Sequence, residues 1–244
     1  MQPEQLPLLT ILIPVFNEER FIYQVLQHVA GASLPGLRRE LVVVNDCSTD
    51  GTSNEVRRFQ ADHPGLAVTL LEHPVNRGKG GAVQTGLQQA AGEFVLIQDA
   101  DFEYDPHDYP DLLRPLVRGV ADVVYGSRFI GSKPHRVLFF YHYMANRMLT
   151  VLSNWFTNLN LTDMETGYKA FRTEIVRPIR LYEQRFGFEP EITAKVSRVP
   201  KVRIYEVGIS YYGRTYEEGK KINWKDGVKA IYYIIKYNSW ARRG

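Results

Sequence analysis

The first half of the chain alternates short apolar runs with longer helix-type segments, and this alternation restricts the fold more than any other feature. The helix-type segments cover residues 19–31, 51–63, 79–91 and 108–118. The β-type runs around them are "LLTILIPV", "ELVVVN", "AVTLLEH", "EFVLIQD" and "ADVVYGS". Strands with apolar residues on both faces require helices on both faces of a parallel sheet. The pattern therefore predicts an α/β fold of Rossmann type, with a mainly parallel central sheet flanked by helices.

A polar cluster follows each of the five predicted strands. These clusters are "PVFNEE", "NDCSTDG", "PVNRGKGG", "QDADFEYD" and "GSRF". In open parallel sheets, ligands bind beyond the carboxyl ends of the strands. We therefore expect the five clusters to meet in one crevice.

The second half has a different character, and no linker separates it from the first. Residues 137–158 predict a long apolar helix that could be core, dimer surface or a lipid track. A loop at 161–171, a helix near 188–198 and a strand near 201–208 follow. We expect one continuous domain, with a nucleotide-binding half at 1–130 and an extension at 131–244.

The last predicted helix carries two stripes. Trp224, Val228, Ile231 and Ile235 form the apolar stripe, and Lys225, Lys229 and Lys236 form the basic one. The first stripe predicts packing on the core, whereas the two together are typical of a helix lying on a membrane surface. Both interpretations stay open at this point.

Charge and composition exclude several classes of protein. The net charge is +3, yet from Lys220 onward seven basic residues face one acidic residue, which favours an anionic partner such as a membrane surface. An excess of basic residues that lies mainly in the tail, beside an apolar stripe, argues against nucleic acid. No run is apolar enough for a signal peptide or a membrane span, and the single Cys47 suits a reducing compartment. We expect a cytoplasmic protein attached peripherally to the inner face of the membrane.

The stretch "FVLIQDADFEYDP" places acidic residues directly behind a predicted buried strand. Residues two apart on an extended chain point to the same side, so Asp99, Asp101 and Glu103 could share one cation. Three oxygen ligands without His or Cys suit Mg²⁺ or Mn²⁺. We expect Asp105 and Asp108 to begin the next helix instead.

A magnesium ion held by few carboxylates usually completes its coordination with phosphate, which points to a nucleotide diphosphate. Asp46 offers acceptors for a base and ribose, and Lys79 brings positive charge to a helix start. "NRGKGG" lacks the Ser or Thr that the phosphate loop of NTPases requires, and no "GxGxxG" follows the first strand. The sequence therefore argues against both NTPases and dinucleotide oxidoreductases.

Four motifs in order, "TILIPVFNE", "LVVVNDCSTDGT", "NRGKGGAVQTGL" and "GEFVLIQDADFEYDP", resemble the family 2 glycosyltransferases of the GT-A fold. Further along, "VVYGSRF", "DMETGYKAFR", "FGFEPEI" and "VGISYYGRTYEEGKKINWKDG" narrow the resemblance to the dolichyl- and polyprenyl-phosphate mannose or glucose synthases. The resemblance covers nearly the whole chain. Asn45 stands where a second Asp is common in the family, which leaves the base undetermined.

The resemblance implies a set of site residues. The nucleotide sugar is expected at Pro14, Phe16, Glu18, Asp46, Lys79, Asp99 and Ala100. The metal is expected at Asp99, Asp101 and Glu103. Arg128 and Arg147 are expected to bind the acceptor phosphate, and Arg214 with Lys220 or Lys221 to close over the diphosphate. Asp101, Arg128, Arg147 and Arg214 are the expected catalytic residues.

The predicted reaction is metal-dependent, inverting transfer of a hexose from GDP-mannose or UDP-glucose to a polyprenyl or dolichyl phosphate. Alternatives remain. Asp163 or Glu165 could act as base for a sugar-hydroxyl acceptor, and Arg128 could simply pair with Asp122 or Asp163. A sugar nucleotidyltransferase or a non-catalytic nucleotide-binding protein would share the α/β layer, although the former normally has a Gly-rich loop after its first strand. A homodimer is possible.

Overall fold

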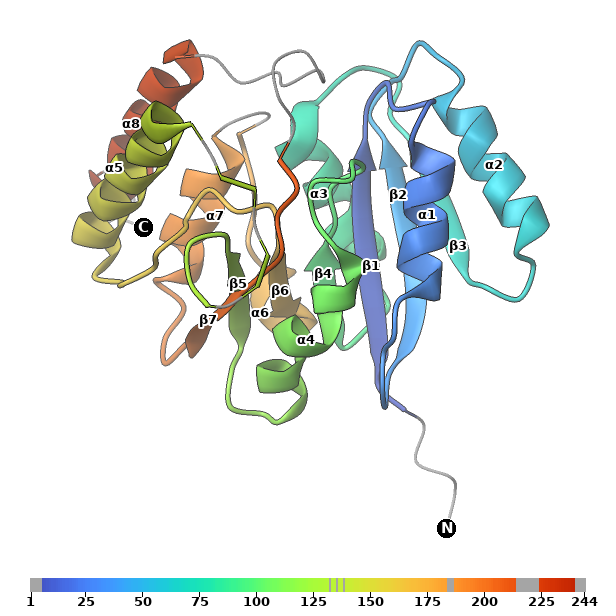
Figure 1. Cartoon of the computed structure of the whole chain (residues 1–244), viewed down its shortest axis with the longest axis horizontal. Coiled ribbons are helices and arrows are strands. Elements are labelled where there is room, and N and C mark those ends of the chain that lie inside the picture. Colours follow the sequence, from blue (N-terminus) through green and yellow to red (C-terminus); the bar gives the residue numbers. More distant parts are fainter. Residues whose placement is uncertain are drawn as a thin grey trace.

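A computed structural model describes residues 6–131, 133–134, 136–137, 139–183, 187–213 and 224–239. Its centre is a seven-stranded sheet in the order β3-β2-β1-β4-β6-β5-β7 (Figure 1). The strands are β1 (Leu8–Val15), β2 (Arg38–Asn45), β3 (Val68–Glu72), β4 (Phe94–Ile97), β5 (Val123–Ser127), β6 (Lys169–Arg172) and β7 (Ile204–Gly208). The sheet runs through both halves of the chain without a break.

The sheet is parallel except at β6, which pairs antiparallel with both β4 and β5. The prediction of a mainly parallel α/β sheet is therefore confirmed. β6 itself lies inside the segment predicted as a loop at 161–171. It was missed because it has only four residues and begins with a lysine, Lys169, that is fully buried. The reversed direction of β6 places its start beside the ends of β4 and β5.

Helices cover both faces of the sheet. One face packs against α1 (Ile22–Gly31), α2 (Thr52–Asp62) and α4 (Tyr109–Val117). The other packs against α3 (Gly78–Gln89), α6 (Thr173–Val176) and α7 (Phe188–Val196). The short 3₁₀ helix η1 (Pro106–Asp108) precedes α4. The helix boundaries expected up to residue 198 lie within about three residues of those observed.

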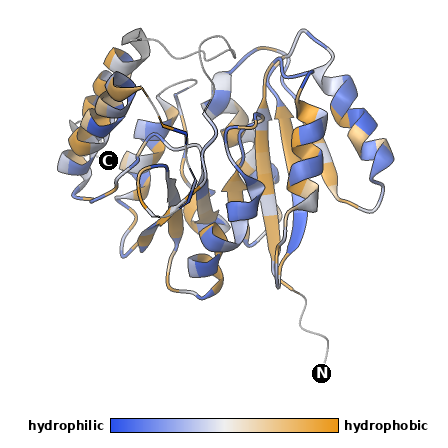
Figure 2. Cartoon of the chain, in the orientation of Figure 1, coloured by the Kyte–Doolittle hydropathy of each residue, from blue (hydrophilic) through white to orange (hydrophobic). Residues whose placement is uncertain are grey.

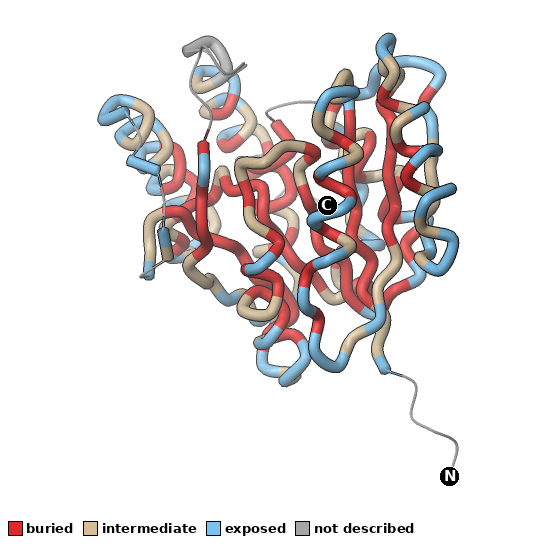
Figure 3. The backbone as a smooth tube through the Cα atoms, turned by 45° about the vertical axis from the view of Figure 1, so that its right-hand side comes forward, coloured by how far each residue is buried: buried red, intermediate tan, exposed pale blue. Residues whose placement is uncertain are grey.

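Alternation along β1 shows how the sequence builds these two layers. Leu9, Ile11 and Ile13 are fully buried on the α1 side, and Leu12 is buried on the α3 side. Each such side chain contributes roughly 1.5–3 kcal/mol when it leaves water. Figure 2 shows the hydrophobic strands between more hydrophilic helices, and Figure 3 shows the same strands as the buried centre of the molecule.

The helices α5 (Phe140–Thr157) and α8 (Trp224–Ser239) lie side by side at the end of the molecule far from β3 (Figure 1). α5 buries only Leu149, Thr150 and Ser153. It leaves long apolar side chains exposed: Phe140, Tyr141, Met144, Met148, Val151 and Trp155. The interpretation of this helix as a core element is wrong for that side of it. No helix among the described residues is both long enough and apolar enough to cross a bilayer.

The apolar stripe expected on α8 is also wrong in part. Among the α8 side chains that the structure describes, Ala230, Ile234, Tyr237 and Asn238 are buried, because this helix packs against α5 and α7 together. The side chains of Trp224 and Lys225, also predicted for the two stripes, lie outside those described. Val228, Tyr232 and Ile235 are exposed instead. We call the exposed apolar side chains of α5 and α8 the outer face.

Candidate active site

The loops after β1 and β2 hold each other through side chains. The backbone N–H of Asn17 donates to Ser48 Oγ at 2.9 Å, and the N–H of Thr49 donates to Asn17 Oδ1 at 2.8 Å. Asn17 has φ 54°, in the left-handed region that Asn adopts more readily than most residues. Beside these bonds lie three residues predicted to contact the nucleoside: Pro14 and Glu18 are half-buried and Phe16 is exposed.

Asp46 is buried, and its carboxylate anchors the start of α3. Its oxygens accept from the backbone N–H groups of Arg77 at 2.7 Å and Gly78 at 2.6 Å. His73 Nδ1 lies 2.7 Å from Asp46 Oδ1. A carboxylate at a helix start stabilises the unpaired N–H groups there. Asp46 therefore fixes the position of Lys79 in the first turn of α3, a role that its predicted contact with a base did not include.

The acidic residues after β4 do not continue the strand. β4 ends at Ile97 and residues 100–103 form a bend, in which Asp101 Oδ1 accepts from the N–H of Glu103 at 3.1 Å. Glu103 Oε2 accepts from the hydroxyl of Tyr211 at 2.9 Å. Nowhere in the described part of the chain do three acidic, His or Cys side chains converge as metal ligands. The predicted alternation of Asp99, Asp101 and Glu103 is wrong because the chain turns where it was assumed to be extended.

The next two acids have different roles. Asp105 caps η1, accepting from the N–H of His107 at 2.9 Å, as predicted. Asp108 sits before α4 but does not cap it with its side chain. Its carboxylate instead accepts from the N–H of Ser210 at 2.6 Å and from Lys133 at 2.9 Å. Asp108 stands at the start of α4 as predicted, and its side chain joins the two halves of the chain in place of capping that helix.

Lys79, at the start of α3, connects the first half of the chain to α7 in the second half. Its Nζ lies 2.9 Å from Asp99 Oδ1 and 3.1 Å from Glu189 Oε1 on α7. Burial alone would lower the pKa of Lys79, but the two carboxylates outweigh it and raise that pKa above its usual value. Lys79 therefore stays charged and compensates Asp99.

Asp99 and Asp101, on either side of Ala100, offer the kind of ligand that a hard divalent cation requires. Carboxylate oxygens are the ligands that such ions prefer. A side chain at Gly167 would collide with Asp99 Oδ2 and with the ring of Tyr104, so only glycine allows this close approach. Asp99 and Asp101 would hold the ion, whereas Glu103 is committed to Tyr211.

Arg128, at the end of β5, is paired inside the protein. Its Nε and Nη2 donate to the two carboxylate oxygens of Asp163 at 2.6 and 2.7 Å, and its backbone N–H donates at 3.1 Å. Asp163 is fully buried and Arg128 is 9% exposed. The alternative that Arg128 pairs with Asp163 is therefore what the structure contains. Asp122 binds Arg203 instead, with Arg203 Nη2 at 2.6 Å.

Two residues after Asp163, the polar groups lack partners. Glu165 Oε1 and Thr166 Oγ1 are inaccessible to solvent and form no hydrogen bond. Burial and the nearby Glu189 raise the pKa of Glu165 to about 8. Lys169 is fully buried, donates to the carbonyl of Thr166, and has its pKa lowered to about 8 by burial. Glu189, which pairs with Lys79, acts on both groups, because its charge raises the pKa of Glu165 and opposes the lowering of the pKa of Lys169.

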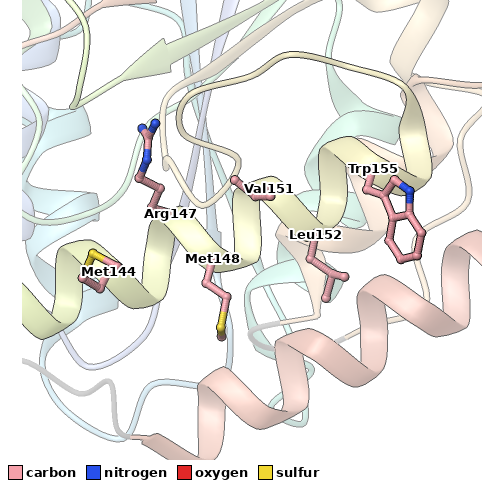
Figure 4. Close-up of a pocket in the computed structure, with 6 residues that line it drawn as sticks. All are labelled: Met144, Arg147, Met148, Val151, Leu152 and Trp155. Carbon is pink, nitrogen blue, oxygen red and sulfur yellow. The ribbon is translucent and has the colours of Figure 1, made fainter.

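Arg147 lies on α5 and is exposed, with no ion pair among the described residues. It borders a shallow hollow of about 440 Å³, lined otherwise by Met144, Met148, Val151, Leu152 and Trp155. Figure 4 shows the guanidinium of Arg147 pointing away from α8, on the side opposite Met148 and Leu152. Arg147 and Arg128 are therefore not equivalent, since one is exposed and the other is paired.

Sequence reasoning missed two residues of this site, Glu189 and Lys169. Glu189 lies in "FGFEPEI", where an acid inside an otherwise buried helix was the available signal. Lys169 could have been noticed as a lysine within an apolar run. Arg214, Lys220 and Lys221, predicted to close over the diphosphate, lie outside the described residues.

Comparisons with known proteins identify the family and the fold of this chain. The family described as "Glycosyl transferase family 2" matches residues 10–180. The chain belongs to this family. The predicted family and fold class are confirmed.

Curated relatives share most of this chain. A dodecaprenyl-phosphate galacturonate synthase of Rhizobium johnstonii is 29% identical over 93% of the chain, and a dolichol-phosphate mannosyltransferase of Pyrococcus furiosus is 27% identical over 93%. The chain spans only 64% of the length of each of these two relatives. An undecaprenyl-phosphate mannosyltransferase of Micrococcus luteus is 31% identical over 86% of this chain and 85% of its own.

Among solved structures, the glucosyl-3-phosphoglycerate synthase of Mycobacterium tuberculosis is similar in fold. It superposes with a TM-score of 0.72 at 20% identity, over 96% of this chain and 80% of its own. That enzyme was crystallised with Mn²⁺, UDP and glucosyl-3-phosphoglycerate, and also with Mg²⁺ and UDP. At this identity the likeness establishes the fold alone.

Proposed function

We propose that this chain is a metal-dependent, inverting glycosyltransferase. It moves a hexose from a nucleotide-diphosphate sugar to the phosphate of a polyprenyl or dolichyl lipid. GDP-mannose and UDP-glucose are the donors that we would test first. The observation that carries the proposal is a combination of two features. Asp99 is held beside Lys79 after the end of β4, and the second half of the chain presents an exposed arginine, Arg147, on an apolar helix.

The donor side has the groups that a nucleotide diphosphate needs. The interlocked loops after β1 and β2 would receive the nucleoside next to Phe16, at the edge where open α/β sheets bind ligands. Asp99 and Asp101 would hold Mg²⁺ or Mn²⁺, which supplies Lewis-acid stabilisation of the negative charge on the departing diphosphate. Lys79 places a second positive charge beside Asp99.

The acceptor side suits an anion on a lipid. A phosphate monoester is already ionised, so it requires positioning by a cation and no base. Tyr143 packs on Phe129 with their ring centroids 5.2 Å apart, and Arg147 lies one turn further along α5 on the same side. This contact puts the turn of Arg147 near the end of β5. In this arrangement Arg147 would bind the phosphate. Arg128 would be a positioning residue, because its side chain holds Asp163 and the segment around it in place.

The chemical step is a single displacement. An oxygen of the acceptor phosphate forms a bond to the anomeric carbon, the bond from that carbon to the diphosphate breaks, and its electron pair leaves on the diphosphate. Attack from the opposite face inverts the configuration. An α-linked donor would therefore give a β-linked lipid-phosphate sugar.

The outer face offers a way to reach such an acceptor. Trp155 and Tyr141 on α5 are 78% and 83% exposed, and Val228 and Tyr232 extend the apolar surface onto α8. Lys229 on α8 is exposed as well. Aromatic and aliphatic side chains beside basic ones are typical of proteins that lie on a bilayer surface. We propose that this face touches the membrane that holds the acceptor, and the inner face of the membrane remains our expectation.

A sugar hydroxyl as acceptor is the second candidate. It requires a base, and Asp163 is occupied by Arg128. Glu165 keeps a free oxygen and is the residue on which this alternative depends.

The test is a matrix of purified protein, Mn²⁺, one of the two donors, and either a short polyprenyl phosphate or the matching polyprenol. We expect a β-linked product only with the phosphate, identified by mass and by NMR of the anomeric centre. Product from the polyprenol, or an α-linked product, would contradict the proposal.

The variant Asp101→Ala should reduce turnover by about 10²–10³-fold, because charge on the leaving group loses stabilisation. Asp62→Ala changes an exposed carboxylate on α2 and serves as the matched control. The thermal midpoint of both variants shows whether the bend at 100–103 survives. Full turnover by a folded Asp101→Ala protein would remove the metal assignment.

A further inference from the structure

The segment from Thr162 to Tyr168 is fixed at almost every residue. Arg128 binds the carboxylate of Asp163, and Glu206 accepts from the N–H groups of Thr162 and Asp163 at 2.9 and 3.1 Å. The N–H of Met164 donates to Thr150 Oγ1 at 3.2 Å. These bonds leave the segment little freedom to rearrange.

The end of the same segment lies against the candidate metal site. The N–H of Gly167 donates to the hydroxyl of Tyr104 at 2.7 Å. Gly167 also lies so close to Asp99 that any side chain there would collide with its carboxylate. Glu165 and Thr166 are therefore held next to the place where the donor diphosphate is proposed to bind.

Within this fixed segment, Glu165 Oε1 and Thr166 Oγ1 have no partner. Thr166 is 0% exposed, so bulk solvent cannot form a hydrogen bond with its hydroxyl group. An unpaired buried polar group costs about 1–3 kcal/mol, and native proteins rarely keep two of them side by side. Because the backbone is anchored, the segment cannot relieve that cost by turning. A ligand with polar groups would supply the hydrogen bonds that these two atoms lack.

The neighbouring charges define the chemistry of that ligand. Lys169 donates to the carbonyl of Thr166, and Glu189 binds Lys79 at 3.1 Å. An anion would be repelled by Glu189, and an apolar group would leave both free oxygens unpaired. A ring with adjacent hydroxyls can donate to the carboxylate and accept from the ammonium and hydroxyl groups.

We propose that Glu165, Thr166 and Lys169 form the subsite that binds the hydroxyl groups of the transferred hexose and selects among its epimers. The inference rests on the proposed function, in which the diphosphate lies at Asp99 and the hexose is attached directly to it. A site that hydrogen-bonds a sugar hydroxyl rejects the epimer that cannot make the bond, since its own buried groups then stay unpaired. Glu165 is on this account a specificity residue.

The experiment measures binding of donor fragments by calorimetry in the presence of Mn²⁺. The ligands are UDP and GDP, and then UDP-glucose, UDP-galactose and GDP-mannose. Wild-type protein is compared with Glu165→Gln and with Thr166→Val, which removes only the hydroxyl. Glu174→Gln, an exposed acid on α6, is the matched control.

We expect Glu165→Gln to weaken binding of the preferred nucleotide sugar by about 10-fold or more. The variant should also discriminate less between nucleotide sugars that carry different hexoses. Affinity for the nucleoside diphosphate should stay within about twofold, because the lost contact is to the sugar. Thr166→Val should lower the ratio of nucleotide-sugar affinity to nucleoside-diphosphate affinity by a smaller factor than Glu165→Gln does. Glu174→Gln should shift nothing.

Three results would overturn the inference. An unchanged ratio of sugar to diphosphate affinity in both variants would mean that these residues do not touch the hexose. Equal weakening of both ligand types would indicate a structural role. Unchanged donor binding with a large loss of turnover would make Glu165 the base for a hydroxyl acceptor. If wild-type protein binds no nucleotide at all, the proposed function itself fails, and this inference fails with it.

Discussion

Two carboxylates on one short segment have opposite environments. Asp163 is fully buried and receives three bonds from Arg128 alone. Glu165, two residues later, has an inaccessible oxygen that receives none. Both belong to "TDMETGY", and the sequence offers no sign of the difference.

The contrast separates groups that hold the fold from groups that await a ligand. A buried ion pair is strongly destabilised when one partner is removed, because the other charge is left uncompensated. A buried group without a partner contributes no such bond, so its mutation removes little stability. The functional side of the site is therefore expected where polar groups are incompletely bonded, and stability is expected to depend on the saturated side.

The largest expected effect comes from Asp163→Asn. This change leaves the guanidinium of Arg128 buried without a counter-charge and should lower the free energy of unfolding by about 3–5 kcal/mol. Urea titration followed by tryptophan fluorescence measures it. In the same assay Glu165→Gln should not lower the free energy of unfolding, since no bond to Glu165 Oε1 is lost and the raised pKa of this carboxyl means that its charge opposes folding.

Equal destabilisation of the two variants would contradict the distinction between Asp163 and Glu165. In that case Glu165 would belong to the saturated structural network, and its free oxygen would carry no functional meaning. A reversed order, with Glu165→Gln the more harmful, would contradict both assignments.

A smaller effect is expected at Gly167, which lies between the two carboxylates and the candidate metal site. Gly167→Ala forces a methyl group against Asp99 and Tyr104, and overpacking of this kind costs about 1–3 kcal/mol. Binding of Mn²⁺ with nucleotide should weaken as well, because Asp99 must move. Thermal unfolding and calorimetry measure the two effects.

Gly31→Ala provides the matched control for that substitution. Gly31 is exposed at the end of α1, and a methyl group there meets no atom within 4 Å. The change should leave stability unaltered or raise it by up to about 1 kcal/mol, since alanine favours a helix. Equal behaviour of the two variants would show that Gly167 is not sterically constrained.

The fold could be predicted from the sequence because its signals are local. Continuous apolar runs such as "ELVVVN" specify buried parallel strands, and four motifs in a fixed order identify the family. β6 escaped prediction because its neighbours β4 and β5 are far from it in the chain, and only their pairing makes the segment extended.

The site was less predictable because its geometry depends on tertiary contacts. Assigning Asp99, Asp101 and Glu103 to one cation required an extended chain, but the chain bends and Tyr211, from the other half, takes the carboxylate of Glu103. Whether Arg128 faces a ligand or Asp163 likewise depends on a partner 35 residues away. Residue types were readable from the sequence, but their pairing was not.

Glu165 and Asp122 should differ in how their contribution to stability depends on pH. Arg203 lowers the pKa of Asp122, so the stabilisation from that carboxylate is present above its unfolded pKa of about 3.9 and is lost as pH falls. Burial raises the pKa of Glu165 to about 8, so the folded protein binds an extra proton between the unfolded pKa of about 4.3 and pH 8. Stability from Glu165 should therefore decrease as pH rises through that window.

The difference in unfolding free energy between wild type and Glu165→Gln, measured from pH 5 to pH 8, isolates this slope from all other groups. Wild type should lose stability relative to the variant as pH increases. For Asp122→Asn the corresponding difference should be flat over this range and change only in acid, because both pKa values of that carboxyl lie below pH 5. A flat difference for Glu165→Gln would mean that its carboxyl titrates normally, and the contrast between Glu165 and the saturated carboxylates would lose its electrostatic basis.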